Sequence, residues 1–316
     1  MSKYREIDLT KIRTISIKDR LSKVDVENFA GVFKRGMSFH SFLNSLPKIL
    51  KGSDLRELVG RIVEGHRQDK PLIWMMGSHV IKCGLAPVVV DLMERGIISA
   101  VAFNGSGVIH DIESAYWGKT SEDVATNLDD GTFGMSAETA ELVNDTINLN
   151  REPNLGMGEI LGKRVAEENP EYARFSILAS GYKNSIPVTV HVGIGTDIVH
   201  QHPNADGAAI GIRSLRDFRI LAETITKLGD GGVVVNIGSA VILPEVFLKA
   251  LTVARNTGFD VGNFYTADFD MIQHYRPGLN VVERPVSKGG KGFRFTGHHE
   301  IMIPLLAAGI IESLAE

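Results

Sequence analysis

Short apolar runs alternate with longer amphipathic segments along much of the chain. Four such runs lie at 71–77, 98–103, 186–193 and 231–238. They are too continuous for strands with one face in water, so they predict parallel strands buried on both faces. The segments 80–96, 213–232 and 244–258 have the apolar spacing of helices that pack on a sheet. This alternation predicts an α/β fold, a doubly wound and mostly parallel, Rossmann-like sheet with right-handed crossovers.

The remaining segments predict the domain organisation. Residues 112–180 are charged and helical in pattern, as expected of an insertion across the strand ends. No internal repeat or low-complexity linker divides the chain. We therefore expect residues 1–65 to form an N-terminal helical extension and residues 66–316 to form a single domain.

The composition excludes several classes of protein. Apolar residues make up 43% and charged residues 23%, the balance of a soluble globular protein. The net charge of −4 argues against non-specific nucleic-acid binding, and no run reaches the roughly 20 apolar residues of a membrane helix. The N-terminus lacks the apolar stretch of a secretory signal, and the single cysteine, Cys83, excludes an internal disulfide and suits a reducing compartment. We expect a cytoplasmic protein.

Glycine-rich segments follow all four apolar runs, at 77–84, 104–111, 193–197 and 236–240. Ligands of open parallel sheets bind beyond the carboxyl ends of the strands, where glycine lets backbone N–H groups approach phosphate oxygens. None of the four has the G-x-G-x-x-G fingerprint of common dinucleotide sites. They predict a nucleotide-sized ligand, although Asn104–Gly107 could equally be a tight connection without a ligand, followed by polar residues of a helix start.

A histidine-rich loop offers a second kind of chemistry. His191, Asp197, His200, His202 and Asp206 lie close together in sequence and could bind a divalent metal. The alternative is a polar loop in which one histidine caps a strand end. Because no third and fourth ligand stand at a fixed spacing, we expect no metal.

Two lysines, Lys288 and Lys291, lie among glycines near the C-terminal end. A desolvated lysine on a flexible turn can act as a nucleophile that forms imines. The alternative is a solvated hairpin tip.

Several motifs together resemble the deoxyhypusine synthase family, and most closely the bacterial deoxyhypusine-synthase-like proteins. They begin with FKRGMSFHSFL from residue 33 and continue with GSHVIKCG from residue 77 and FNGSGVIHD from residue 103. The correspondence continues with TADFD at 266–270 and GHHEIMIPLL at 297–306, and it ends with PLLAAGII at 304–311. It therefore covers most of the chain.

The resemblance implies a homotetramer of tight dimers that binds NAD in clefts between subunits. It places the cofactor, by position, on residues of the strand-end segments: Ser78, His79, Asn104, Gly105, Ser106, Gly107, His110, Asp111, Gly238, Ser239, Asp270, Gly297 and His298.

The family oxidises spermidine with NAD and passes an aminobutyl group through a lysine to a protein acceptor. By resemblance, Lys288 or Lys291 would be that lysine, and Asp197 would be a shifted substitute for the acidic residue of the family's turn. The family's His-rich helix start is replaced by SAVILPEVFLKA from residue 239. Arg276 and Arg284 favour a substrate carboxylate.

Three functions follow. The first is an NAD-dependent enzyme that oxidises an amine or amino-acid C–N bond of a small molecule, with group transfer as an option. The second is a true deoxyhypusine or homospermidine synthase. The third is a protein that keeps the NAD cleft without catalysis, or a metal-using hydrolase built around His200 and His202.

Overall fold

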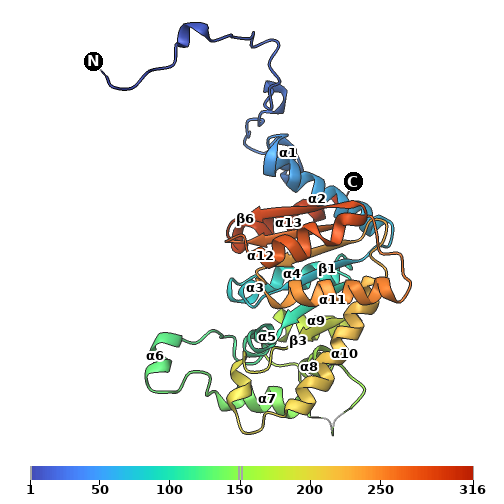
Figure 1. Ribbon diagram of the computed structural model, residues 1–316. Helices are drawn as coiled ribbons and strands as arrows, with labels where there is room; N and C mark the ends of the chain where they lie inside the picture. The colour runs from blue at the N-terminus through green and yellow to red at the C-terminus, as the bar shows by residue number, and fades with distance from the viewer. Residues whose placement is uncertain (1, 149, 151, 316) are drawn as a thin grey trace.

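Six parallel strands form one sheet in the computed structural model, which describes residues 2–148, 150 and 152–315. The sheet order is β3-β2-β1-β4-β5-β6 (Figure 1). The strands are β1 (Leu72–Met76), β2 (Ala100–Asn104), β3 (Val188–His191), β4 (Val233–Ile237), β5 (Phe264–Asp270) and β6 (Gly290–Thr296). The expected α/β fold with a doubly wound parallel sheet is confirmed.

Both faces of the sheet are covered, which explains the continuous apolar runs. Along β1, Trp74 and Met76 lie in one layer of the core, whereas Ile73 and Met75 lie in the other. The first layer is completed mainly by α2 (Leu50–Arg67), α4 (Ala86–Glu94), α5 (Gly105–Trp117), α8 (Met157–Glu168), α9 (Ile177–Lys183) and α13 (His299–Leu314). The second is completed by α10 (Gly207–Ile225), α11 (Ile242–Asn256) and η5 (Gly278–Glu283).

Element bounds differ from the prediction in a few places. The predicted helix 80–96 is two helices, α3 (His79–Lys82) and α4, because the chain turns at Gly84 with φ of +76°. Strands β5 and β6 extend the sheet beyond the four predicted strands. The middle of the chain is helical, as expected, with α5, α6 (Val124–Asp129), α7 (Ala137–Ile147), α8 and α9.

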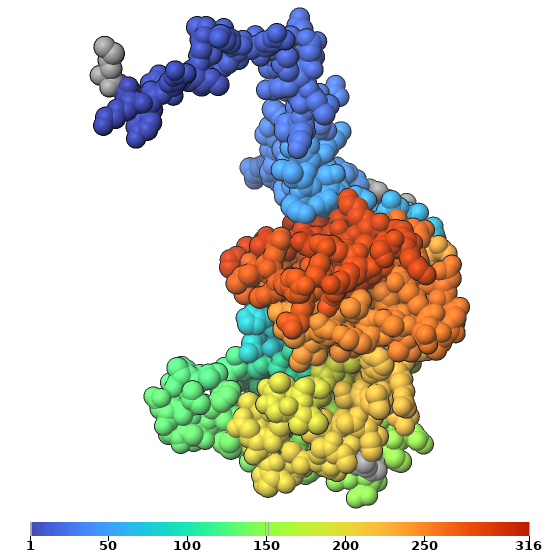
Figure 2. Space-filling view, viewed as in Figure 1, coloured from blue at the N-terminus to red at the C-terminus, as the bar shows by residue number. Residues whose placement is uncertain are grey.

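The first part of the chain projects from the body as an extended arm, residues 2–38 (Figures 1 and 2). Its regular structure is limited to the short turns η1 (Leu9–Lys11) and η2 (Val26–Asn28). Helix α1 (Phe39–Ser45) follows, and α2 then packs into the core through residues such as Leu58 and Ile62. The predicted domain boundary at residue 65 therefore falls inside a core helix.

No helix within the described residues is long and apolar enough to cross a membrane. The helix with the highest mean hydropathy, α13, is amphipathic only weakly and lies in the core beside α2.

Candidate functional site

The sheet order changes direction between β1 and β4. The chain proceeds from β1 through β2 to β3 on one side, and from β4 through β5 to β6 on the other. In open parallel sheets this switch point leaves a crevice beyond the carboxyl ends, where ligands bind. Gly77 follows β1 here, and a Cβ on it would lie 2.3 Å from the carbonyl oxygen of Gly238, which follows β4. The two strand ends approach so closely that only glycine fits at residue 77.

On the β4–β6 side, polar residues stand at each strand end. Asp270 is buried at the end of β5, accepts a hydrogen bond from the backbone N–H of Met271, and lies 3.8 Å from the His274 imidazole. Gly297 follows β6, and the next two residues differ sharply in exposure. His298 has a side chain 66% exposed, whereas His299 is buried, and its Nδ1 atom has no hydrogen-bond partner among the described residues. Burial lowers the pKa of His299.

Asn104–Gly107, predicted as a turn, is the start of helix α5. Asn104 ends β2 and caps the helix, because its side chain accepts a hydrogen bond of 3.1 Å from the Gly107 N–H. Ser106 also donates to that side chain, at 3.1 Å. A Cβ on Gly105 would lie 1.9 Å from Oδ2 of Asp197, so the space beside this glycine is filled by the protein itself.

Asp197 lies in the loop after β3, immediately before η4, and its side chain reaches the first turn of α5. It is buried, and Oδ2 has no hydrogen-bond partner among the described residues. Burial raises its pKa to about 6. Its side chain accepts a hydrogen bond from the backbone N–H of His200, whereas Oδ2, the oxygen without a partner, is a candidate for contact with a substrate or cofactor.

A cleft of about 650 Å³ opens beside Asp197 and the start of α5. Its walls come from α3, α5, α7 and the segment before η4 (Ile198–Gln201). The remaining wall is the connection between α5 and α7, residues 118–136, which carries α6 and is called the excursion below. Its charged lining residues are Lys82, His110, Glu113, Lys119, Glu122, Glu138 and Asp197.

Within this cleft, three side chains form a hydrogen-bonded chain. His110 Nδ1 lies 2.5 Å from Thr120 Oγ1, and Thr120 donates to Glu113 Oε2 at 2.6 Å. Thr139 of α7 donates to the other oxygen of Glu113 at 3.1 Å. The network ties α5 and α7 to the excursion.

Two of the predicted cofactor residues have structural partners. Asp111 is buried and accepts hydrogen bonds from Ser176 Oγ and from the N–H groups of Ile177 and Leu178, so it caps helix α9. Ser239 is also buried, and its hydroxyl accepts a bond from the Leu243 N–H in the first turn of α11. Ser78 and His79 lie at the end of β1, half-buried and exposed respectively.

The histidine loop is held by backbone contacts. His200 Nδ1 accepts N–H bonds from Gly195 and Asp197, and His202 Nε2 contacts the Gly134 carbonyl oxygen at 2.8 Å. His191 is buried in β3, 3.0 Å from Thr189 Oγ1. No group of three or more His, Cys, Asp or Glu side chains within the described residues could hold a metal ion.

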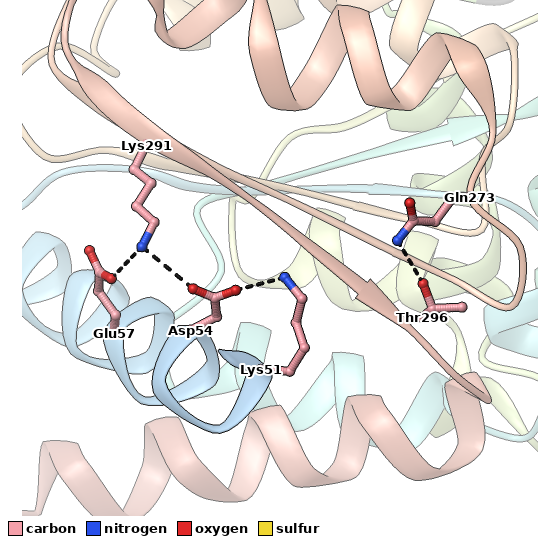
Figure 3. A network of polar contacts seen from close by, with 6 residues as sticks. All are labelled: Lys51, Asp54, Glu57, Gln273, Lys291 and Thr296. Carbon is pink, nitrogen blue, oxygen red and sulfur yellow. Dashed lines mark hydrogen bonds and ion pairs between the residues drawn. The ribbon is translucent and has the colours of Figure 1, made fainter. Parts of the chain in front are cut away.

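The two lysines lie at the amino end of the sheet, opposite the cleft. Lys288 is exposed and ends η6 (Pro285–Lys288), and Lys291 lies near the start of β6. Lys291 contacts Glu57 at 2.6 Å and Asp54 at 3.5 Å, both on α2, whereas Thr296 at the other end of the strand contacts Gln273 (Figure 3). These carboxylates raise the pKa of Lys291 and keep it protonated. Within one chain the lysines do not reach the cleft, so a nucleophilic role stays a prediction.

Sequence reasoning missed three cleft residues and one buried histidine. Glu113 lies three residues after His110, a spacing that places both on one face of a helix, so it carried a usable signal. Lys82 lies at the end of α3. The sequence predicted one helix over 80–96 in place of α3 and α4, so it did not indicate that Lys82 lines the cleft. Thr120 and His299 had no local signal, because only the packing brings them to the site.

In sequence comparison, neither a protein family nor a curated protein matches this chain. Solved structures share its fold. A protein from Entamoeba histolytica named as a deoxyhypusine synthase aligns over 90% of this chain and 96% of its own, with a TM-score of 0.51 and 12% identity. A Methanococcus maripaludis S2 protein named LOR/SDH aligns over 84% of this chain and 71% of its own, with a TM-score of 0.50 and 16% identity.

AgrE, solved as a ternary complex with ornithine and NAD+, has a TM-score of 0.55 and 11% identity. The alignment covers 83% of this chain but 33% of AgrE, so this chain spans about a third of that protein. At these identities the likeness establishes the fold. It confirms the fold that the resemblance to deoxyhypusine synthase implied.

Proposed function

We propose that this protein is an NAD-dependent enzyme that oxidises the C–N bond of a small amine or amino acid. The observation that carries the proposal is the meeting of two features at the carboxyl edge of the sheet. One is the switch point between β1 and β4, where dinucleotides bind in folds of this order. The other is the adjacent cleft, lined by the buried Asp197, whose Oδ2 atom has no hydrogen-bond partner among the described residues. A neighbour of the same fold, AgrE, was solved with NAD+ and ornithine.

The residues of the edge fit a dinucleotide. Gly77 and Gly238 allow the ends of β1 and β4 to meet closely at the switch point, and Lys82 with the exposed His79 imidazole lies beside it to contact a diphosphate. We propose that Ser78, His79, Asn104–Gly107, His110, Asp270, Gly297 and His298 line the cofactor. Gly238 and Ser239 belong to the same edge, where Ser239 accepts a hydrogen bond from the first turn of α11. Asp111 does not face the cofactor in this proposal; it fixes α5 against α9 by accepting the Ile177 N–H. A bound NAD would supply the oxidant for the C–N bond.

The charges of the cleft favour a substrate with an ammonium group. Glu113, Glu122, Glu138 and Asp197 all line it. Asp197 is the carboxylate we propose to hold the ammonium next to the reacting carbon. A substrate carboxylate would be read by Lys82 or Lys119, since Arg276 and Arg284 are occupied by Glu245 and Asn280. An amine or amino acid therefore suits the cleft.

Exposed apolar surface supports the homotetramer, a dimer of dimers, as the working assembly. The large apolar residues of the arm, apart from the half-buried Met37, are 57–94% exposed, from Val24 to Leu21. A second exposed set borders the carboxyl edge: Val241, Met271, Ile272, Tyr275 and Ile301. Many exposed apolar side chains in one region are typical of a protein–protein contact. A second subunit over the edge would also be the only route by which Lys288 or Lys291 could reach a cofactor. A cytoplasmic location fits the free thiol of Cys83.

The test combines binding and turnover. NAD should raise the melting temperature of the purified protein, and a panel of diamines and basic amino acids should yield NADH with at least one member. The variant Asp197→Asn should keep the NAD-dependent stabilisation and lose NADH formation. Stabilisation without any NADH would favour a non-catalytic NAD-binding protein, and absence of both would overturn the proposal. Transfer of an aminobutyl group from spermidine would instead favour the deoxyhypusine or homospermidine synthase function.

A further inference from the structure

The hydrogen-bonded chain in the cleft determines the state of one histidine. Glu113, as a carboxylate, can only accept hydrogen bonds, and it accepts from Thr120 at 2.6 Å. The Thr120 hydroxyl has one hydrogen, which this bond uses. His110 Nδ1, 2.5 Å from the same oxygen, must therefore be the donor. The neutral imidazole then carries its proton on Nδ1 and a free lone pair on Nε2.

The surroundings keep this imidazole neutral and accessible from the cleft. Its side chain is 11% exposed and lines the cleft, and no described residue bonds its Nε2 atom. The charged groups that face it are His79 and Lys82 from α3 and Glu113 from its own helix. Burial, with help from Lys82 and His79, lowers the pKa of His110 to about 4. Asp197 lines the same cleft. A substrate ammonium bound to Asp197 would therefore lie in the cleft that His110 also lines.

We propose that His110, through Nε2, is the group that accepts a proton from the substrate ammonium, and that Thr120 and Glu113 position it. The inference rests on the proposed function. With NAD bound, the ammonium would give one proton to His110, and the oxidised nicotinamide would supply the acceptor for the hydride from the adjacent C–H. The C–N single bond becomes a C=N bond, and the products are an iminium ion, reduced cofactor and a protonated His110.

Thr120 has a separate role as a positioning residue. It belongs to the excursion that carries α6, whereas His110 and Glu113 lie on α5. Without its hydroxyl, Nδ1 would lose its acceptor, and nothing would favour one tautomer over the other. Thr139 offers a matched comparison, because it donates to Glu113 but does not touch His110.

Nitrogen NMR of the protein without ligands tests the tautomer independently of activity. In ¹⁵N-histidine-labelled protein at neutral pH, His110 should give a protonated Nδ1 and an unprotonated Nε2. Thr120→Val should shift its signals toward a mixture of tautomers, and Thr139→Val should leave them as in the wild type. An Nε2-protonated His110 in the wild type, or equal effects of the two threonine variants, would overturn the assignment.

Kinetics test the proton acceptor. His110→Asn retains a side-chain donor for Thr120 but has no equivalent of Nε2. With NAD at a saturating concentration, so that the loss of one cofactor contact does not limit turnover, it should lower kcat by about 100-fold or more, the lower range for loss of a general base. Unchanged kcat in His110→Asn would refute the role while leaving the proposed function intact. A wild type that binds NAD but oxidises no amine would instead defeat the proposed function, and the assigned role with it, whatever the tautomer.

Discussion

Substituting Gly105 by alanine tests whether this glycine is required by the protein itself. A Cβ at this position would lie 1.9 Å from Oδ2, 2.6 Å from Cγ and 3.1 Å from Oδ1 of Asp197. Carbon and oxygen atoms do not approach so closely, so the carboxyl would have to turn away from α5 and give up its hydrogen bond from the His200 N–H. We expect Gly105→Ala to lower the free energy of unfolding by about 1–3 kcal/mol, the usual cost of overpacking.

Gly60 provides the matched control. It lies within helix α2, and a Cβ added there would meet nothing within 4 Å. Gly60→Ala should therefore stabilise the protein by up to about 1 kcal/mol through helix propensity. In a chain of this size, a loss of 1–3 kcal/mol corresponds to a melting temperature lower by roughly 2–6 °C. Urea unfolding of both variants by circular dichroism gives the free energies.

A double-mutant cycle with Asp197→Ala identifies the cause. Removing the carboxyl should relieve the clash, so the double variant should recover about 0.5–3 kcal/mol relative to additivity. If Gly105→Ala proved as harmless as Gly60→Ala, or if the two changes were additive, the packing argument would fail. A larger residue at position 105 would clash with Asp197 whether or not a cofactor binds. A loss of NAD binding in such a variant could therefore not be assigned to a lost cofactor contact alone.

Three further predictions use other parts of the molecule. Burial lowers the pKa of His191 to about 3, so below pH 6.5 the unfolded chain gains a proton that the folded chain does not, and stability falls by about 1.4 kcal/mol per pH unit. His191→Asn should flatten this decline in urea titrations between pH 6.5 and 4.5, and a parallel decline in both proteins would contradict it. Borohydride added during turnover should trap an adduct on Lys288 or Lys291 if either is the nucleophile, and normal turnover by both alanine variants would exclude transfer through lysine. Light scattering should give an oligomer, and a clean 34.5 kDa monomer at micromolar concentration would refute the tetramer.

Much of the fold was predictable because its signals are local. The runs at 71–77 and 231–238 consist of apolar residues and glycine, apart from Asn236, since β1 and β4 are central strands covered on both faces. The helix at 244–258 was predictable for the same kind of reason, as its apolar spacing follows one buried face in α11. Strand β6 was harder, because its sequence is rich in glycine and charge and much of it is exposed.

The candidate site was predictable in part. The glycine-rich strand ends indicated the edge of the sheet at which the switch point and the cleft lie, since parallel strands place all their carboxyl ends together. The roles of individual residues there did not follow. Asp111 and His110 are adjacent in sequence, yet one points to α9 and the other to the cleft, because successive helical positions are rotated by about 100°.

The sequence by itself determined the alternation of strands and helices, the parallel sheet and the polar strand ends, since each depends on neighbours a few residues away. Only the tertiary structure decided which distant residues meet. Asp197 fills the space beside Gly105, Thr120 of the excursion sets the proton of His110, and the register of β6 puts Lys291 against α2. These contacts form between elements that are far apart in the sequence, so no pattern of neighbouring residues predicts them.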